Sequence, residues 1–375
     1  MRKNFLKEYS EFFTSIEGAF QFDAALLLIA HNQIINSQGI FGDVLEIGVR
    51  QGLSSIVVAA LRGTGRRFFA VDLFDDMQSE NVSGSGAGDK AAFVRNMSCF
   101  YENTGFLEII SSNSLALKPS DLGLEFSFCH IDGGHSDAET YHDLELCSQI
   151  LIPGGLVAVD DYFNPSFPGV CEGAVRFMME YPEALAPVAI GFNKVLFCKP
   201  GSSFSLNAVF ASTFPYIPRD SAMLWGIPVN LFWSKLLYFF DLSLSTPGCL
   251  VRDSNTNLGA VYEPQTHHLS AKTNNVVQLP VKVTNNSTTP FQCGDHTFGL
   301  SYHLLSNDGV MLKRDNVRHF FKQPLQPAEQ RIVELSILVP EEIGNYLVEI
   351  DLVWEGVMWF KDKGNPTSIV NLVVS

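Results

Sequence analysis

An apolar run that ends in a glycine-rich turn constrains the fold more than any other segment of the chain. Residues 44–52 read VLEIGVRQG, and an apolar helical pattern follows them. This order predicts a buried parallel strand, a tight turn at Gly48 and Gly52, and the start of a helix. A second apolar run ends at Asp72, about 20 residues after the turn, where such folds place an acid against a ribose. The two features predict an α/β sheet that binds a nucleoside-bearing small molecule at the carboxyl ends of its strands.

The residues around the glycines indicate which nucleoside would bind. A dinucleotide site needs Gly-x-Gly-x-x-Gly, and Arg50 stands at the middle glycine of that pattern here. The sequence also has no phosphate-loop motif of the form Gly-x-x-x-x-Gly-Lys-Ser/Thr. The carboxylate of Glu46 would repel a diphosphate but attract a cation. We therefore expect S-adenosylmethionine (AdoMet), which is cationic and has no phosphate. The alternative is a glycine turn that only lets a helix pack on a strand.

Charge and composition exclude several classes of partner. The formal net charge is −15, which disfavours nucleic acid and anionic membrane surfaces, since both need clustered Lys and Arg. The seven cysteines are scattered without a Cys-x-x-Cys pair, so we expect reduced thiols rather than disulfides or zinc. The basic first residues lack the apolar core of a signal peptide. These features predict a cytoplasmic protein. Its expected partner is a small-molecule or glycan acceptor, as argued below from the site residues, with homo-oligomerisation left open.

Strand-like and helix-like patterns alternate from Asp43 to Pro200, which predicts a Rossmann-like, doubly wound parallel sheet in a domain of residues 1–200. Two apolar runs close this region, Ala186–Gly191 and Lys194–Cys198, and only Phe192-Asn193 separates them. Such a short connection predicts an antiparallel hairpin, because a parallel crossover needs a dozen or more residues.

Residues 201–261 are expected to form a linker with an apolar helix. Within them Trp225–Leu244 is strongly apolar, but Gly226, Pro228 and Lys235 interrupt it. A membrane span needs about 20 mostly apolar residues. We expect a helix that packs between domains. A membrane-surface or oligomer contact is the first alternative, and a membrane span is the least favoured.

Residues 262–375 have a different pattern, with short alternating runs such as Val276–Val283 and Tyr346–Trp354. Turn sequences such as Asn307-Asp308-Gly309 separate these runs. This spacing predicts an all-β sandwich domain of immunoglobulin-like size.

Acidic residues follow two further strands of the predicted sheet. One apolar run ends at Asp132, and a later one ends at Asp160 and Asp161. The two strands are neighbours in a doubly wound sheet, so the three carboxylates would enter the same crevice as the cofactor. Crowded carboxylates repel one another, and a hard divalent cation offsets that charge. We expect these residues to bind Mg²⁺, which would lower the pKa of an acceptor hydroxyl and orient its oxygen toward the methyl donor.

Three more features surround this crevice. His135 lies on the turn after Asp132 and could take the proton of the attacking hydroxyl, although it could also only cap the next helix. The polar, glycine-rich segment Phe74–Lys90 directly follows Asp72 and predicts a mobile lid, with an ordinary solvated loop as the alternative. Asn113, at the end of the third strand, is placed to bound the adenine.

These motifs resemble those of class I AdoMet-dependent methyltransferases. The matching residues are Glu46-x-Gly48-x-x-x-Gly52, Asp72, residues 130–135 (HIDGGH), residues 153–155 (PGG) and residues 160–162 (DDY). More narrowly, residues 20–200 are similar to the metal-dependent O-methyltransferases of macrolide-sugar and cephamycin biosynthesis, the TylF-like group.

The resemblance implies that Asp132, Asp160 and Asp161 hold Mg²⁺, that His135 is the base and that Asp72 holds the ribose. The lid departs in sequence from that group, so the resemblance implies no particular substrate. The pattern of short strands and turns in the C-terminal region is similar to that of sandwich modules of bacterial polysaccharide-processing proteins.

The leading expectation is an AdoMet- and Mg²⁺-dependent O-methyltransferase acting on a hydroxyl of a sugar or glycoconjugate. Its cofactor-binding residues would be Glu46, Gly48, Gly52, Asp72, Asn113 and Asp132. One alternative is a metal-independent small-molecule methyltransferase, in which the acids only accept hydrogen bonds. The other is a glycan-binding protein whose α/β domain only retains AdoMet. In that case Trp354, Trp359 and Phe360 could form a sugar platform, although their spacing favours a sandwich core.

Overall fold

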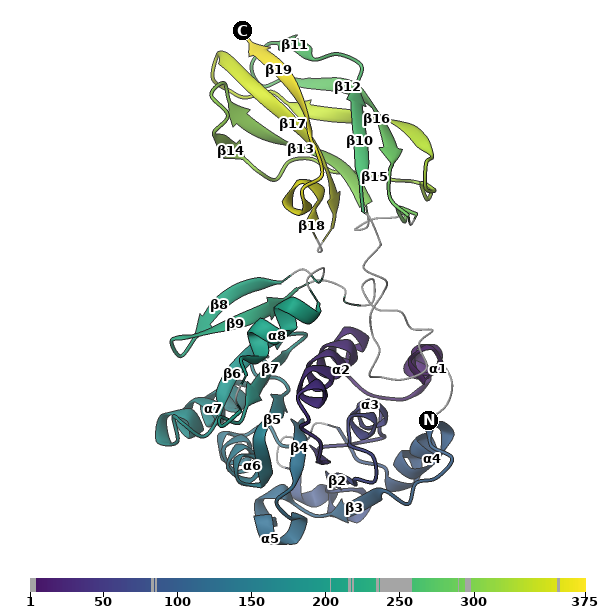
Figure 1. The fold of residues 1–375 in the computed structure, drawn as a ribbon, viewed down its shortest axis with the longest axis vertical. Helices are drawn as coiled ribbons and strands as arrows, with labels where there is room; N and C mark the ends of the chain where they lie inside the picture. Colours follow the sequence, from purple (N-terminus) through teal and green to yellow (C-terminus); the bar gives the residue numbers. More distant parts are fainter. Residues whose placement is uncertain are drawn as a thin grey trace. The chain divides into compact units, whose positions relative to one another are not determined.

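A computed structural model describes residues 5–81, 84, 86–202, 204–214, 217, 219–233, 236, 258–288, 290–293, 298–355 and 358–375. The chain divides into two compact units, Met1–Arg252 and Asp253–Ser375 (Figure 1). The sequence predicted domains at 1–200 and 262–375 with a linker between them. The first unit instead continues past residue 200, because two further strands join its sheet there.

The first unit is built on one nine-stranded sheet with the order β3-β2-β1-β4-β5-β7-β6-β9-β8. Strands β1 to β5 are parallel neighbours, whereas β7 is antiparallel to both β5 and β6. This confirms the predicted doubly wound sheet and its closing hairpin. The strands are β1 (Asp43–Ile47), β2 (Phe68–Asp72), β3 (Leu107–Ser111), β4 (Phe126–Ile131), β5 (Leu151–Val159), β6 (Ala186–Gly191), β7 (Lys194–Cys198), β8 (Asp220–Leu224) and β9 (Ile227–Phe232).

Helices cover both faces of this sheet. Figure 1 shows α2 and α3 on one side of β4 and β5, and α6 and α7 on the other. Every residue of β1, β4 and β7 is buried, as expected for strands covered on both faces. The helices are α1 (Phe5–Phe12), α2 (Phe22–Ser37), α3 (Ser55–Ala60), α4 (Lys90–Phe100), α5 (Pro119–Leu122), α6 (Asp137–Ile150), α7 (Pro168–Glu180) and α8 (Leu206–Thr213).

The predicted apolar helix within Trp225–Leu244 is wrong for the residues that the structure describes there. Trp225 and Gly226 have φ angles of +48° and +76° and form a tight turn between β8 and β9. Strand β9 then pairs with β6, and its Phe232 packs against His31 of α2 with ring centroids 5.8 Å apart. The short apolar stretch Ile227–Phe232 by itself fits a strand as well as a helix, so composition could not separate the two there. Residues 234, 235 and 237–244 of the predicted helix lie outside the described residues. No helix within the described ranges is long and apolar enough to span a membrane.

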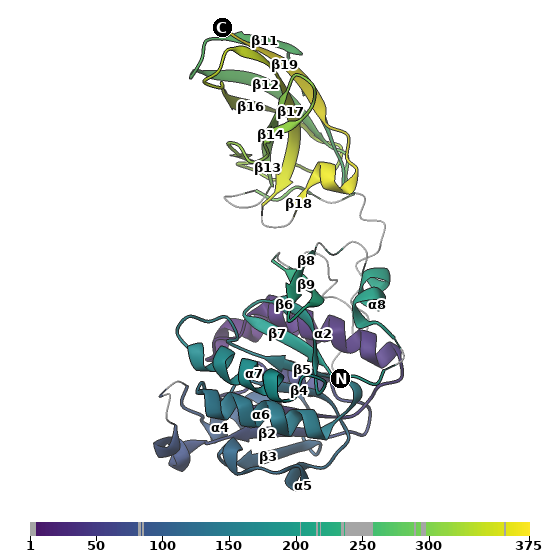
Figure 2. The same cartoon turned by 90° about the vertical axis from the view of Figure 1, so that its left-hand side faces the viewer.

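The second unit consists of two β-sheets, seen from a second direction in Figure 2. One has the order β10-β12-β16, and the other has the order β11-β19-β17-β13-β14, with β15 beside β13 and β18 beside β17. The strands of this unit are β10 (Ala260–Pro264), β11 (His268–Ala271), β12 (Val276–Asn285), β13 (Phe298–Ser306), β14 (Met311–Lys313), β15 (His319–Phe320), β16 (Gln330–Leu338), β17 (Gly344–Trp354), β18 (Met358–Trp359) and β19 (Ser368–Val374). The predicted runs Val276–Val283 and Tyr346–Trp354 are confirmed to within two residues as β12 and β17.

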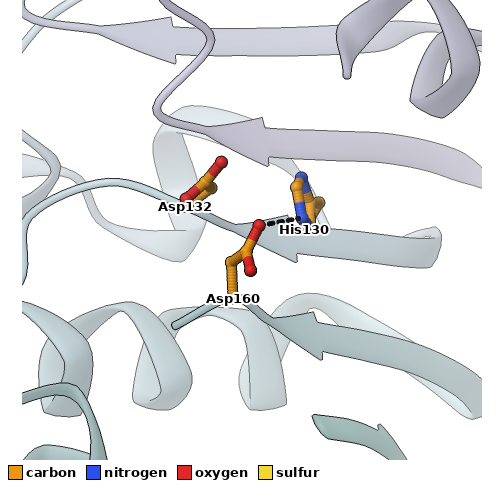
Figure 3. Close-up of side chains that lie close together, drawn as sticks. All are labelled: His130, Asp132 and Asp160. Atoms are coloured by element: carbon orange, nitrogen blue, oxygen red, sulfur yellow. Dashed lines mark ion pairs between the residues drawn. The ribbon is translucent and has the colours of Figure 1, made fainter. Parts of the chain in front are cut away.

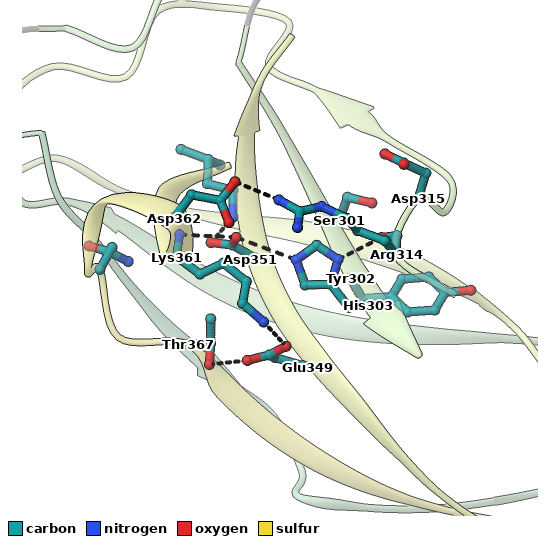
Figure 4. Close-up of polar contacts among 12 residues, drawn as sticks. Ser301, Tyr302, His303, Arg314, Asp315, Glu349, Asp351, Lys361, Asp362 and Thr367 are labelled. Atoms are coloured by element: carbon teal, nitrogen blue, oxygen red, sulfur yellow. Dashed lines mark hydrogen bonds and ion pairs between the residues drawn. The ribbon is translucent and has the colours of Figure 1, made fainter. Parts of the chain in front are cut away.

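Polar side chains join the two sheets of the second unit. The hydroxyl of Tyr262 on β10 donates to Asp351 Oδ1 on β17 at 3.2 Å. Asp351 and His303 are both fully buried, with Oδ2 and Nε2 3.5 Å apart (Figure 4). Carboxylates this deeply buried persist in folded proteins when they are paired, as here. The pairing of Tyr262, Asp351 and His303 therefore explains why these polar side chains are buried.

Candidate active site

A cavity opens in the first unit where β1, β2 and β4 end. Its wall combines the glycine turn after β1, the end of β2, the loop after β3 and the turns after β4 and β5. The carboxyl ends of parallel strands are where open α/β sheets bind their ligands. The residues that line it are Ala19, Ile47, Gly48, Arg50, Val71, Asp72, Leu73, Gln78, Asn81, Gly86, Ser112, Asn113, Ser114, Asp132, Gly133, Gly134, His135, Glu139, Asp161 and Phe167.

Gly48 lets the strands β1 and β4 end side by side. Its φ is +85°, and a Cβ on it would lie 1.9 Å from the carbonyl oxygen of Asp132. Its N–H donates to the Val71 carbonyl at 2.8 Å, and the Asp132 N–H donates to the Ile47 carbonyl at 2.8 Å. A side chain at this position would therefore push apart the two strand ends that bound the cavity.

Asp72 holds the glycine turn in shape. Its Oδ2 accepts hydrogen bonds from the backbone N–H groups of Val49 at 2.9 Å and Arg50 at 2.8 Å. Its Oδ1 accepts from the Phe74 N–H at 3.1 Å. The carboxylate lines the cavity and retains acceptor capacity, because each carboxylate oxygen can accept two hydrogen bonds.

Two of the expected cofactor-binding residues lie behind the cavity wall. Gly52 has a φ of +89°, and a Cβ on it would come within 3.0 Å of the Phe93 ring of α4. Glu46 is fully buried and accepts hydrogen bonds from the Ser55 hydroxyl and from His130 Nδ1, the latter at 2.8 Å. Neither belongs to the described lining, so both shape the turn from behind rather than from within the cavity.

Part of the expected lid borders the cavity. Residues Asp75–Glu80 form a short 3₁₀ helix, η2, and Gln78, Asn81 and Gly86 line the cavity. A Cβ on Gly88 would lie 2.4 Å from Asp72 Oδ1, so this segment closes directly on the end of β2. Asn113 lies nearby, where its Oδ1 accepts from the Leu115 N–H at 3.1 Å. Residues 82, 83 and 85 of the expected lid lie outside the described residues.

The three predicted acids lie close together, in two overlapping groups that share Asp132. One group is His130, Asp132 and Asp160, and the other is Asp132, His135 and Asp161. Within each group the candidate ligand atoms all lie within 4.8 Å of one another. Figure 3 shows the first group, with His130 and Asp160 facing each other. Of the predicted acids, Asp132 and Asp161 line the cavity, whereas Asp160 lies just behind it.

Asp161 and His135 form a pair at the cavity. His135 Nε2 lies 3.1 Å from Asp161 Oδ2, and the imidazole stacks on Phe167 with centroids 3.9 Å apart. Burial raises the pKa of Asp161, but hydrogen bonds from His135, Asn164 and Asn193 outweigh it and lower the pKa to about 2. Asp161 is therefore ionised at neutral pH, and its Oδ2 contacts His135 on the turn after β4.

Asp132 has the opposite electrostatic environment. Its burial and the neighbouring carboxylate of Asp160 raise its pKa well above the usual value of 3.8. Both effects disfavour another negative charge in this space. A positive charge in the cavity beside these acids would relieve that repulsion.

Two buried residues of this cluster were missed by the sequence analysis. The ammonium of Lys194, only 2% exposed, donates to Asp160 Oδ2. His130 is fully buried, and its Nε2 lies 3.8 Å from the same oxygen without a hydrogen-bond partner. Both stand as polar residues at the ends of apolar runs, in FSFCHI and KVLFC, and that is the sequence signal that could have found them.

Comparison with known proteins gives one family match. Residues 45–162 match the model of a family described as a methyltransferase domain. No curated protein sequence matches the chain. The matched segment runs from β1 to the turn after β5 and contains nearly all of the cavity wall.

Solved structures of methyltransferases are also similar to this chain. The O-methyltransferase NovP is 15% identical with a TM-score of 0.42, covering 49% of this chain and 84% of its own. CalS11, a TDP-rhamnose 3'-O-methyltransferase of calicheamicin biosynthesis, is 17% identical with a TM-score of 0.36, covering 53% and 93%. An O-methyltransferase from Bacillus cereus in complex with SAH is 14% identical with a TM-score of 0.36, covering 54% and 92%. Residues 45–162 of this chain are thus similar to a methyltransferase domain.

Proposed function

We propose that this protein is an AdoMet- and divalent-metal-dependent O-methyltransferase that acts on a hydroxyl of a sugar or glycoconjugate. The observation that carries the proposal is the gathering of Asp132, His135 and Asp161 in the same cavity as the glycine turn and Asp72. One cavity thus combines the proposed donor site with the side chains proposed to bind the metal and accept the proton.

AdoMet fits the chemistry of the cavity wall. Asp72 offers carboxylate oxygens to a ribose, and Asn113 with its serine neighbours bounds the place of the adenine. Gly48 itself lines the cavity, so the backbone forms the wall at this turn. When bound, AdoMet supplies the methyl group on a sulfonium, whose positive charge suits a cavity with acidic residues at one end.

The donor set also fits a divalent cation. Asp132, Asp160 and Asp161 would hold it, and hard cations of this kind prefer carboxylate oxygens. The His130 Nε2 atom, buried beside them without a hydrogen-bond partner, indicates that this space is built for a positive group. When bound, such an ion lowers the pKa of a coordinated hydroxyl and fixes its oxygen in place.

His135 is the proposed base. Its ring is held by the stack on Phe167 and by Asp161, which stays ionised and stabilises the imidazolium formed when the ring takes a proton. Methyl transfer needs the attacking oxygen, the methyl carbon and the sulfur in line, so holding these groups on strand ends of one sheet contributes directly to rate.

One observation favours the metal-independent alternative. Lys194 already neutralises Asp160, so part of the acidic cluster is compensated without a metal. The glycan-platform alternative has no such support. Trp354, Trp359 and Phe360 are 5%, 7% and 1% exposed, which places them in the core of the second unit, for which we propose an immunoglobulin-like sandwich.

A turnover assay distinguishes the metal-dependent from the metal-independent methyltransferase. Transfer of the labelled AdoMet methyl group to a panel of sugar nucleotides, glycosides and catechols is measured with Mg²⁺ and with EDTA. Asp161→Asn is expected to abolish the Mg²⁺-stimulated turnover while leaving AdoMet affinity within a few-fold, because Asp161 belongs to the acidic group rather than to the glycine turn and Asp72. Asp220→Asn, the same change on the exposed edge strand β8, is the matched control and should behave as wild type. Turnover that is unchanged in EDTA would exclude the metal role.

A further inference from the structure

Lys194 is a buried cation that the proposed mechanism does not use. It begins β7, its side chain is 2% exposed, and its ammonium donates to Asp160 Oδ2. The ammonium also lies 4.8 Å from the centroid of the Phe20 ring. A lysine at the start of a strand can usually extend its ammonium into water, so this inward position calls for an electrostatic explanation.

The explanation lies in the charges that surround Asp160. Its Oδ1 accepts from the Asp161 N–H at 2.9 Å, and its Oδ2 faces both Lys194 and His130. Beyond them lie the carboxylates of Asp132 and Asp161. Lys194 is thus the one lysine or arginine that pairs with this cluster among the described residues.

His130 does not replace Lys194 in this role. Glu46 lies 2.8 Å from His130 Nδ1, and a carboxylate at that distance fixes a proton on Nδ1. The Nε2 atom then directs its lone pair at the acidic cluster when the ring is neutral, and it makes no hydrogen bond there. An N–H or O–H donor also suits this nitrogen, but only a cation offsets the charge of the three carboxylates as well.

We propose that Lys194 is the resident counter-cation of this cluster: its ammonium holds Asp160 when no divalent metal is bound, and a metal must displace it from Asp160 Oδ2. This inference rests on the proposed function, because it takes Asp132, Asp160 and Asp161 as the metal-binding residues. Lys194 is then a positioning residue that sets the metal affinity of the site and keeps the cluster assembled without metal.

The two roles of Lys194 predict effects of opposite sign. Removing the ammonium leaves Asp160 unpaired in the metal-free protein, which lowers the melting temperature. The same change removes a competing positive charge, which strengthens metal binding. A lysine that only packs or stiffens the site would weaken both properties.

The test is a Mn²⁺ titration of the full chain, in which the electron paramagnetic resonance signal reports the free ion. Lys194→Met is expected to tighten Mn²⁺ binding on the order of tenfold or more. Lys194→Arg keeps the charge and should restore an affinity near that of the wild type. Lys199→Met is the control, because Lys199 follows the other end of β7 and binds the carbonyls of Ser148 and Leu151.

The outcomes distinguish this inference from the proposed function. Equal or weaker Mn²⁺ binding by Lys194→Met would overturn it, while the metal site would stand if Asp161→Asn loses the ion. No Mn²⁺ binding by the wild type would instead overturn the metal role itself. If Lys194→Met is unfolded without metal, Lys194→Gln is measured in its place. Folding of either variant with Mn²⁺ but not without it supports the inference, and failure of both variants to fold with Mn²⁺ contradicts it.

Discussion

At Gly48 a single hydrogen atom in place of a side chain allows β1 and β4 to end at the same cavity. The φ of +85° would strain any other residue, and the Cβ position also falls on the Asp132 carbonyl. Gly65 offers a matched comparison, because its φ is +74° but no atom lies within 4 Å of its Cβ position. The two positions separate backbone strain from close approach.

Gly48→Ala is therefore expected to lower the free energy of unfolding far more than Gly65→Ala does. The backbone strain alone should lower the free energy of unfolding by about 1 kcal/mol at Gly65. The added clash at Gly48 should bring the loss to on the order of 3 kcal/mol or more, and AdoMet binding should be lost. Denaturant unfolding and calorimetry with AdoMet measure both effects. Equal losses at the two positions would show that close approach is unimportant.

Single residues also show how far the sequence could predict the site. Asp72, Asp132, Asp160 and Asp161 stand directly after apolar runs, so their place at strand ends was encoded locally. His130 and Lys194 were not predicted as site residues, because strand pairing, which the sequence does not show, brings their partners to them. Glu46 is paired with His130 in the register of β1 and β4. In the register of β5 and β7, Val159 is paired with Val195. This pairing brings Asp160, which follows Val159, beside Lys194, which precedes Val195.

At the scale of elements, a buried histidine in α2 should make the stability of the fold depend on pH. His31 is fully buried, its Nδ1 lies 2.9 Å from the Leu27 carbonyl, and its ring packs on Phe210 of α8 with centroids 4.7 Å apart. Burial lowers the pKa of His31 from 6.5 to about 4, against the smaller effect of the Leu27 carbonyl. The folded state thus binds this proton more weakly than the unfolded state does.

The sign of the resulting pH dependence follows. The contribution of neutral His31 to the free energy of unfolding is fully present above pH 6.5, and it is lost as the pH falls toward 4. The expected loss is roughly 3 kcal/mol across that range. His31→Phe should flatten this part of the profile, measured by calorimetry of the unfolding transition at pH 7 and pH 5. An equally steep profile in the variant would exclude His31 as the cause.

The lid segment makes its own prediction. Gly88→Ala would place a methyl group against Asp72 Oδ1, so it should displace the segment and weaken AdoMet binding about tenfold or more. Gly84→Ala, in the same segment, has no atom within 4 Å of its Cβ position, but its φ is +64°, so it is the control for backbone strain without a contact to Asp72. Calorimetric titration with AdoMet compares them. Equal affinities would show that the segment does not help to form the donor site.

Elements with strong local signals were the most predictable from sequence. The hairpin of β6 and β7 has the predicted bounds, because its connection is too short for any other pairing. The β8–β9 hairpin was not foreseen, since its apolar run carries no decisive period and its strand identity comes from the edge of β6 that it covers.

For the whole molecule, every residue of the proposed site belongs to the unit Met1–Arg252. A fragment of residues 1–252 is therefore expected to bind AdoMet as the full chain does. A fragment of residues 1–200 lacks α8, β8 and β9, so it exposes the β6 edge and the ring of His31, and it should aggregate. Calorimetry and size-exclusion chromatography test both fragments. A 1–200 fragment as stable as 1–252 would contradict the structural role of the added strands.

The central claim is that a sulfonium donor and a divalent cation share the cavity at the ends of β1, β2, β4 and β5. A crystal structure of the full chain with AdoMet and Mn²⁺, with anomalous data for manganese, tests it most directly. The account predicts a manganese peak bound by the carboxylates of Asp132, Asp160 and Asp161, with the AdoMet ribose on Asp72. A manganese peak remote from Asp132, or a phosphorylated ligand seated at Gly48, would contradict it.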